Sequence, residues 1–154
     1  MIRVMKLRVS PTPVQEQLLL SYTGSVRAVY NILLYHTSAR YAQRQAELTY
    51  DLPDDALTET ISCSVGGLTR FYMANRDVWV PWWSELPNQV AATAIKALAA
   101  AYDNFFTGKA KYPKYKKKPK SADANVTPVS FHDGECVWVG DGGRTTLLPL
   151  SRVT

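Results

Sequence analysis

The residues with the clearest chemical potential are lysines gathered toward the C-terminal end of the chain. Seven of the 18 Lys and Arg residues lie between Lys109 and Lys120, and no acidic residue interrupts them. The rest of the chain has 11 basic and 13 acidic residues, so the net charge of +5 comes from this lysine run. Concentrated positive charge displaces counterions from a phosphate backbone, which predicts nucleic-acid binding. A solvated linker is the alternative for such a run.

Aromatic and proline residues interleave these lysines. Tyr112 and Tyr115 could stack on bases or sugars, and Pro113 and Pro119 disfavour a regular helix. Tyrosines are poor choices for a purely solvating linker, so we favour the binding interpretation over the linker. The predicted phosphate contacts in this run are Lys109, Lys111, Lys114, Lys116, Lys117, Lys118 and Lys120.

The sequence offers no convincing catalytic or metal-binding constellation. His36 falls on a polar helix face and His132 beside a turn, while Cys63 and Cys136 lie far apart and are expected to be buried as small hydrophobic residues. The aspartates that cluster in loops are ordinary turn and cap residues, which we favour over a magnesium site. No glycine-rich phosphate loop and no GxSxG motif is present. We therefore expect a binding protein with no catalytic residue, metal ligand or cofactor in this chain.

Length and composition are those of a folded domain. The chain has 154 residues, of which 46% are hydrophobic and 20% charged, which argues against disorder. No apolar run approaches the length of a membrane span, and the N-terminus lacks the apolar segment of a secretory signal peptide. We expect a cytoplasmic protein that does not bind membranes.

Hydrophobic periodicity predicts a helical block after a first strand at residues 2–10. Two helices are expected at 13–22 and from residue 25 to about 40, with Gly24 as the stop between them, and this pair also fits a helix-turn-helix. A third helix is expected at 57–75, interrupted or kinked at its two glycines.

The last predicted helix and the end of the chain complete the pattern. Asn88 caps a helix that runs to Phe106, and Gly108 ends it. Beyond the lysines the period changes to two, predicting strands at 126–131, 135–139 and 144–150. We therefore expect an α+β fold: a small antiparallel oligonucleotide-binding-type β-barrel, interrupted by an inserted helical bundle.

Four segments, in the same order, resemble the transposon-encoded TnpB (OrfB) family. Residues 4–12 with Gln15 resemble its R-x-x-P-T-x-x-Q opening, and residues 24–31 its G-x-x-R-x-V-Y-N segment. Residues 101–109 and 112–118 resemble its A-Y-x-N-F-F and F/Y-P-x-F-K-K-K blocks. TnpB proteins are RNA-guided DNA endonucleases related to type V CRISPR effectors, so the resemblance implies guide RNA and target DNA as partners, in a bacterial, nucleoid-associated setting.

The resemblance also implies a domain organisation. Residues 1–10 would be the first strand of a wedge domain, 11–106 the helical recognition domain, and 107–154 the basic segment with the remaining wedge strands. The family's RuvC-like nuclease domain, which would require Mg²⁺, should begin about where this chain stops. We therefore expect no nuclease activity from this chain alone, and a separate chain could carry that domain.

Individual binding residues follow from the resemblance. Tyr50, Asn88, Gln89 and Thr127 match positions that read the DNA motif flanking the target, and Asn or Gln can pair with adenine edges. An N-cap role for Asn88 and a packing role for Tyr50 remain as alternatives. The predicted backbone contacts outside the lysine run are Arg3, Lys6, Arg8 and Arg27.

Two alternatives remain open at this stage. Arg27 and Asn31 share the polar face of one helix, where they could contact phosphate or tie helices together, and we favour the second role slightly. The whole chain could instead be a stand-alone DNA-binding regulator that uses the helix pair at residues 13–45 and needs no guide RNA.

Overall fold

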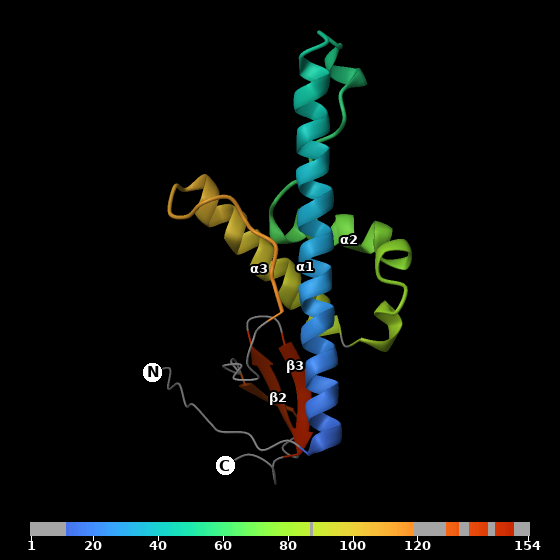
Figure 1. Cartoon of the computed structure of the whole chain (residues 1–154), viewed down its shortest axis with the longest axis vertical. Coiled ribbons are helices and arrows are strands. Elements are labelled where there is room, and N and C mark those ends of the chain that lie inside the picture. The colour runs from blue at the N-terminus through green and yellow to red at the C-terminus, as the bar shows by residue number, and fades with distance from the viewer. Residues whose placement is uncertain (1–11, 87, 119–128, 133–135, 142–143, 150–154) are drawn as a thin grey trace.

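Three α-helices and a small sheet make up the computed structural model, which describes residues 12–86, 88–118, 129–132, 136–141 and 144–149 (Figure 1). The helices are α1 (Pro13–Leu48), α2 (Val65–Trp79) and α3 (Asn88–Phe106), with short 3₁₀ turns at Asp54–Ala56 and Trp83–Glu85. The strands are β1 (Val129–His132), β2 (Cys136–Asp141) and β3 (Arg144–Pro149). Within the described parts, no helix is long and apolar enough to cross a bilayer.

Helix α1 is one uninterrupted helix of 36 residues. The predicted stop at Gly24 is therefore wrong, and no turn separates the two helices expected within residues 13–45. A helix-ending glycine normally takes a positive φ, and Gly24 is not among the residues that do. The buried core residues Val26, Val29 and Tyr30 follow directly after Gly24, and tertiary packing of this kind can stabilise a helix despite a glycine.

Helix α2 starts later than the sequence predicts, at Val65 and not near residue 57. Ser64 caps it, because its hydroxyl accepts the Gly67 N–H at 3.1 Å. The two glycines thus lie in the first turn and do not kink the helix. Gly67 is required there, since a Cβ at this position would fall within 2.5 Å of the Ser62 Cβ.

Helix α3 has the bounds predicted from the sequence, Asn88–Phe106. Gly108 ends it with φ +74°. The Gly108 N–H donates to the Phe105 carbonyl at 3.0 Å, and the Lys109 N–H donates to the Asn104 carbonyl at 2.8 Å. These two bonds are a Schellman motif, which satisfies the last carbonyls and turns the chain back toward α1.

The hydrophobic core lies where α2 and α3 cross the middle of α1 (Figure 1). Its side chains come from the apolar stripes of all three helices and from Val80, which follows α2. The largest fully buried side chains are Leu33, Leu34, Leu68, Leu98, Val29, Val80 and Val90. Burial of such aliphatic side chains contributes about 1.5–3 kcal/mol each. The core therefore fixes the central third of α1, and its two ends extend beyond the core.

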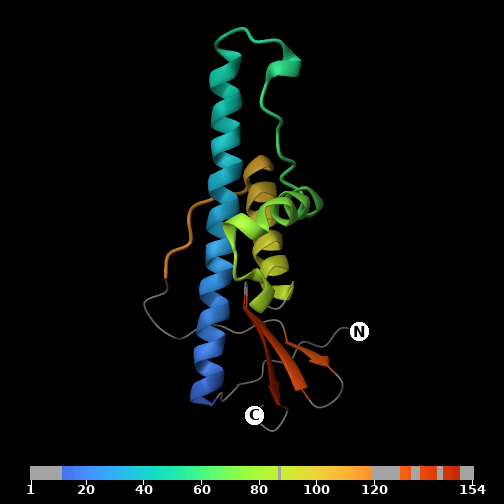
Figure 2. The same ribbon diagram turned by 90° about the vertical axis from the view of Figure 1, so that its right-hand side faces the viewer.

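The far end of α1 projects from the core together with the chain that returns beside it (Figure 2). Glu47 near the end of α1 accepts hydrogen bonds from the backbone N–H and the hydroxyl of Thr58, at 2.6 and 2.7 Å. Arg44 donates to the Thr58 carbonyl at 2.9 Å. The returning segment is thus fastened to α1 through one residue.

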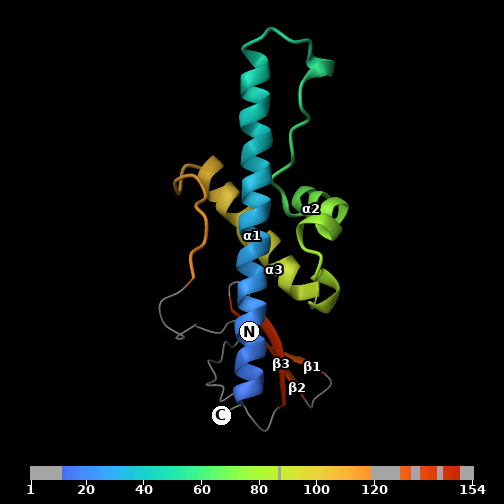
Figure 3. The same ribbon diagram turned by 45° about the vertical axis from the view of Figure 1, so that its right-hand side comes forward.

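The predicted β-barrel is wrong. The described residues are mostly helical, and their strands form an open antiparallel sheet in the order β1-β2-β3. Three strands are too few to close a barrel, and β3 lies beside the start of α1 (Figure 3). Alternation predicts strands but not closure, which depends on a further pairing. The first predicted strand, at residues 2–10, lies outside the described residues.

Candidate nucleic-acid interface

Residues 109–118, which we call the lysine strap, run in an extended path from the end of α3 back along α1 (Figure 3). Asn31 of α1 holds the strap at Lys116. The Asn31 Oδ1 accepts the Lys116 N–H at 2.8 Å, and the Asn31 Nδ2 donates to the Lys116 carbonyl at 3.0 Å. A side-chain amide thus pairs with the strap backbone as a neighbouring strand would.

A second anchor lies at the beginning of the strap. The Tyr112 hydroxyl and the Ser38 hydroxyl of α1 are hydrogen-bonded at 2.8 Å, and the Tyr112 ring meets Phe105 edge-on at 5.2 Å between centroids. Pro113, the next residue, is buried. Tyr112 therefore serves first to attach the strap, and its ring is 41% exposed.

The tyrosine anchor continues into the protein interior. Tyr102 of α3 lies edge-on to Tyr112 at 5.9 Å and shares a 2.6 Å hydrogen bond with Thr37 of α1. Burial raises the pKa of the Tyr102 hydroxyl well above its usual range. The hydroxyl is thus kept protonated, so this chain of hydroxyls is neutral and positions the strap without adding charge.

Apart from Pro113, the strap faces solvent between and beyond the anchors. All six lysines of the strap are exposed: Lys109, Lys111, Lys114, Lys116, Lys117 and Lys118. The Lys116 ammonium lies over the Tyr30 ring, 4.5 Å from its centroid. Tyr115 is 54% exposed, and so its ring is accessible for stacking.

Arg27 extends this basic face along α1. It lies one turn before Asn31 on the same face of the helix, and it is partly buried. Its guanidinium reaches back toward Gly24, where a Cβ would be 4.0 Å from Nη2. Arg27 and the held part of the strap thus share one side of α1. Asn31 has a positioning role, as sequence reasoning slightly favoured, but it holds the lysine strap and not another helix.

Of the four predicted motif-reading residues, the structure describes the side chains of Tyr50 and Asn88. Tyr50 is 76% exposed at the projecting end of α1, about 26 Å along the helix from Asn31. Asp51, Asp54 and Asp55 follow it closely in the sequence, and acids repel phosphate. Asn88 is exposed at the first residue of α3.

The remaining predicted residues cannot be placed. The structure describes the backbone of Gln89 in α3 and not its side chain. Five predicted contacts lie outside the described residues: Arg3, Lys6, Arg8, Lys120 and Thr127.

Groups with potential for metal binding or proton transfer are dispersed in the described parts. No group of three or more His, Cys, Asp and Glu residues there could hold a metal ion. The His36 ring stacks on Trp79 at 4.0 Å between centroids. Partial burial, with a smaller contribution from Arg40, lowers the pKa of His36. His36 is therefore a packing residue in its neutral form.

Fold and surface together define a class: a helical scaffold on which an anchored, extended segment presents lysines along one side of a long helix. Two comparisons narrow this class. A family model described as a helix-turn-helix domain, HTH_OrfB_IS605, matches residues 1–46. A protein of Streptomyces pristinaespiralis named "Putative RNA-guided DNA endonuclease" is 30% identical over 130 residues, which are 84% of this chain and 29% of that protein.

Both comparisons support membership of the TnpB/OrfB family. This confirms the resemblance predicted from the four sequence segments. The chain spans less than a third of the length of the curated relative it matches. In the described part of the family match, residues 12–46, the backbone is a single helix from Pro13 onward and contains no turn.

Proposed function

We propose that this chain is the nucleic-acid-binding N-terminal portion of an RNA-guided DNA endonuclease of the TnpB/OrfB family. Its partners would be guide RNA and target DNA, contacted mainly through phosphates. The observation that carries the proposal is the pair of hydrogen bonds between Asn31 and the Lys116 backbone, which attaches the lysine strap to α1. Family membership and the printed name of the relative support the same function.

Anchoring distinguishes the strap from a solvated linker. A free lysine-rich segment loses conformational entropy when it binds, and this loss reduces its affinity. The bonds from Asn31 and Ser38 fix the strap backbone beforehand, while the lysine side chains stay exposed. The extended strap also suits a polyanion, because charges along it repeat at the spacing of an extended chain.

The nuclease reaction itself would belong to another part of the assembly. We propose that a RuvC-like domain, in the same polypeptide or in a separate chain, supplies the catalytic carboxylates and their Mg²⁺. The residues described here would position RNA and DNA for that domain. The stand-alone helix-turn-helix regulator is not carried forward, because α1 has no turn between residues 13 and 48.

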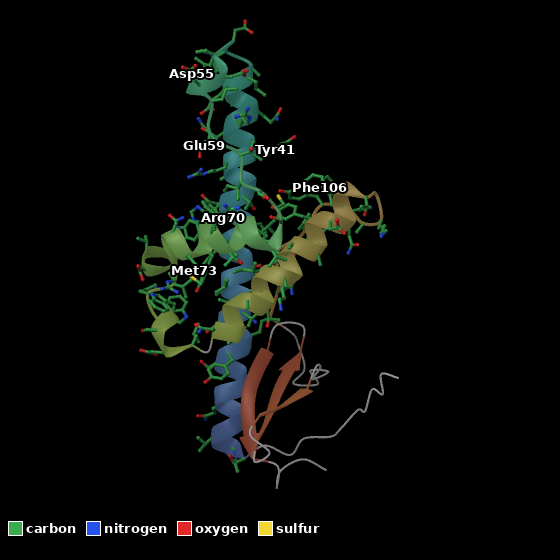
Figure 4. All side chains as sticks on the ribbon, turned by 180° about the vertical axis from the view of Figure 1, so that it is seen from behind. Tyr41, Asp55, Glu59, Arg70, Met73 and Phe106 are labelled. Atoms are coloured by element: carbon green, nitrogen blue, oxygen red, sulfur yellow. The ribbon has the colours of Figure 1, made fainter. Side chains whose placement is uncertain are left out.

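Salt dependence tests the role of the strap. Lys117→Gln with Lys118→Gln should flatten the slope of log K against log salt by about 1.4–1.8, the contribution of two phosphate contacts. The matched control, Arg40→Gln with Arg70→Gln, removes two exposed charges from α1 and α2 (Arg70 is labelled in Figure 4). Arg40 lies over the Phe71 ring, on the α2 side of α1.

The measurement is fluorescence anisotropy with a structured RNA and with a DNA duplex. Equal slope changes in the two double variants would mean that net charge, and not the strap, drives binding. An unchanged slope in the strap variant would mean that these lysines do not contact phosphate and that the segment is a linker. RNA that co-purifies with the chain, and is lost from the strap variant, would support the guide-RNA part of the proposal.

A further inference from the structure

An aromatic hollow opens where the end of α3 and the beginning of the lysine strap meet α1. Its volume is about 340 Å³, and its lining includes Tyr41, Phe105, Phe106 and Tyr112. This volume lies at the lower end of the range found for small-ligand sites. Most of the lining surface is apolar, and Thr37 and Thr60 are also among the lining residues.

The hollow has a fixed floor and an open rim. The Tyr112 ring meets both Phe105 and the buried Tyr102 edge-on, at 5.2 and 5.9 Å between centroids. Tyr41 and Phe106, by contrast, are 61% and 69% exposed, and both lie on the same side of α1 (Figure 4). Two large rings exposed at the rim of an aromatic cavity form a surface that a flat, apolar ligand would cover.

The charge around the hollow indicates what that ligand is. Lys109 and Lys111 lie between Phe106 and Tyr112 in the sequence, and both are exposed. A second hollow, on the Phe106 side, is lined by Lys96 and also by Asp103, the one carboxylate among the described residues that line either hollow. Cations beside an aromatic cavity match a nucleotide, whose base is flat and whose phosphate is anionic.

We infer that the hollow binds one unstacked base of a single-stranded nucleic acid whose backbone continues along the lysine strap. This inference rests on the proposed function and adds to it a site that reads a base face. The base lies against the rings of Tyr41 and Phe106, and its phosphates lie toward Lys109 and Lys111. Because stacking accepts any base, the site selects single-stranded over double-stranded nucleic acid and not one sequence over another.

Two single variants of the chain, Tyr41→Ala and Phe106→Ala, test the inference. Both rings are exposed, so their loss leaves the core intact. The probes are a short oligothymidylate and its abasic counterpart with the same number of phosphates. Each variant should bind the oligothymidylate roughly tenfold more weakly, and the abasic strand as the unaltered chain does. The salt slope should stay unchanged, because no lysine is removed.

The control is Tyr35→Ala, which removes a ring of matching exposure, 59%, from the same helix. Tyr35 lies edge-on to His36 and does not line the hollow. An equal loss in this control, or equal affinity of the unaltered chain for the two probes, would overturn the inference. Photocrosslinking with an iodouracil-substituted strand should label Tyr41 or Phe106, and labelling elsewhere alone would also overturn it.

The two proposals can fail separately. If the lysine strap governs the salt slope but Tyr41→Ala and Phe106→Ala bind the oligothymidylate as the unaltered chain does, only the base site is wrong. In that case, the occupant of the hollow would be an apolar side chain of another protein segment. If the unaltered chain binds no RNA or DNA, both proposals are wrong.

Discussion

Asn31 on α1 and Lys116 on the lysine strap, 85 residues apart in the sequence, are paired through two hydrogen bonds of 2.8 and 3.0 Å. Both bonds use the Lys116 backbone, so its side chain is left to reach over the Tyr30 ring. One amide side chain therefore fixes the path of the strap without neutralising its charge. This separation of attachment from charge makes the contribution of anchoring measurable.

Asn31→Ala should loosen the strap while every lysine remains. We expect the free energy of unfolding to fall by about 1 kcal/mol, since the two bonds are solvent-accessible, and nucleic-acid affinity to fall roughly threefold to tenfold. Hydrogen exchange should accelerate at the Lys116 amide. Asn104→Ala, at an exposed asparagine of α3, is the matched control and should leave exchange at Lys116 unchanged.

A substitution at Gly24 tests whether α1 is continuous there or contains a turn. In the interior of α1, Gly24→Ala should stabilise the protein by up to about 1 kcal/mol, because alanine is the better helix former. Among the residues that the structure describes, the added Cβ meets only Arg27 Nη2, at 4.0 Å. Urea unfolding followed by circular dichroism provides the measurement. Destabilisation by this variant would instead support the turn that the sequence pattern predicted.

Local signals in the sequence predicted local structure well. The bounds of α3 were predictable because an apolar stripe, a proline before its start and a glycine after its end all agree. The prediction at Gly24 was wrong because a single glycine can either end a helix or be tolerated inside one. Tertiary packing of α1 decides which of the two occurs. The barrel failed for a related reason: alternation predicts strands, and closure depends on contacts between distant segments.

The candidate interface likewise has a part that could be predicted from the sequence and a part that could not. The strap lysines were predictable from their density alone, and the structure shows the six described ones exposed. The contacts that hold the strap were not, because Ser38 and Tyr102 show no pattern that would relate them to Tyr112. Aromatic residues of the hollow likewise come from separate elements, so only folding brings them together.

Gly66 and Gly67 provide a matched pair at the start of α2. A Cβ at Gly67 would overlap the Ser62 backbone and side chain, whereas a Cβ at Gly66 meets nothing within 4 Å. Gly67→Ala should therefore lower the free energy of unfolding by about 1–3 kcal/mol, and Gly66→Ala should leave it unchanged or raise it slightly. Thermal unfolding of the two variants in parallel checks this. Equal effects would show that Ser62 does not lie against α2 as described.

Glu47 predicts a pH dependence at the projecting end of α1. The backbone hydrogen bond from Thr58, followed by the bonds from the Thr58 hydroxyl and Gln43, lowers the pKa of the Glu47 carboxyl. A carboxyl with a lowered pKa stabilises the fold above its unfolded-state pKa, and that contribution is lost as the pH falls through its folded-state pKa.

Thr58→Ala should raise the pKa of Glu47 in an NMR titration, because the hydroxyl bond is lost and the backbone bond remains. In Glu47→Gln the acid-induced loosening of the returning segment should disappear. If Thr58→Ala leaves the Glu47 titration unmoved, the fastening of this segment through Thr58 is wrong.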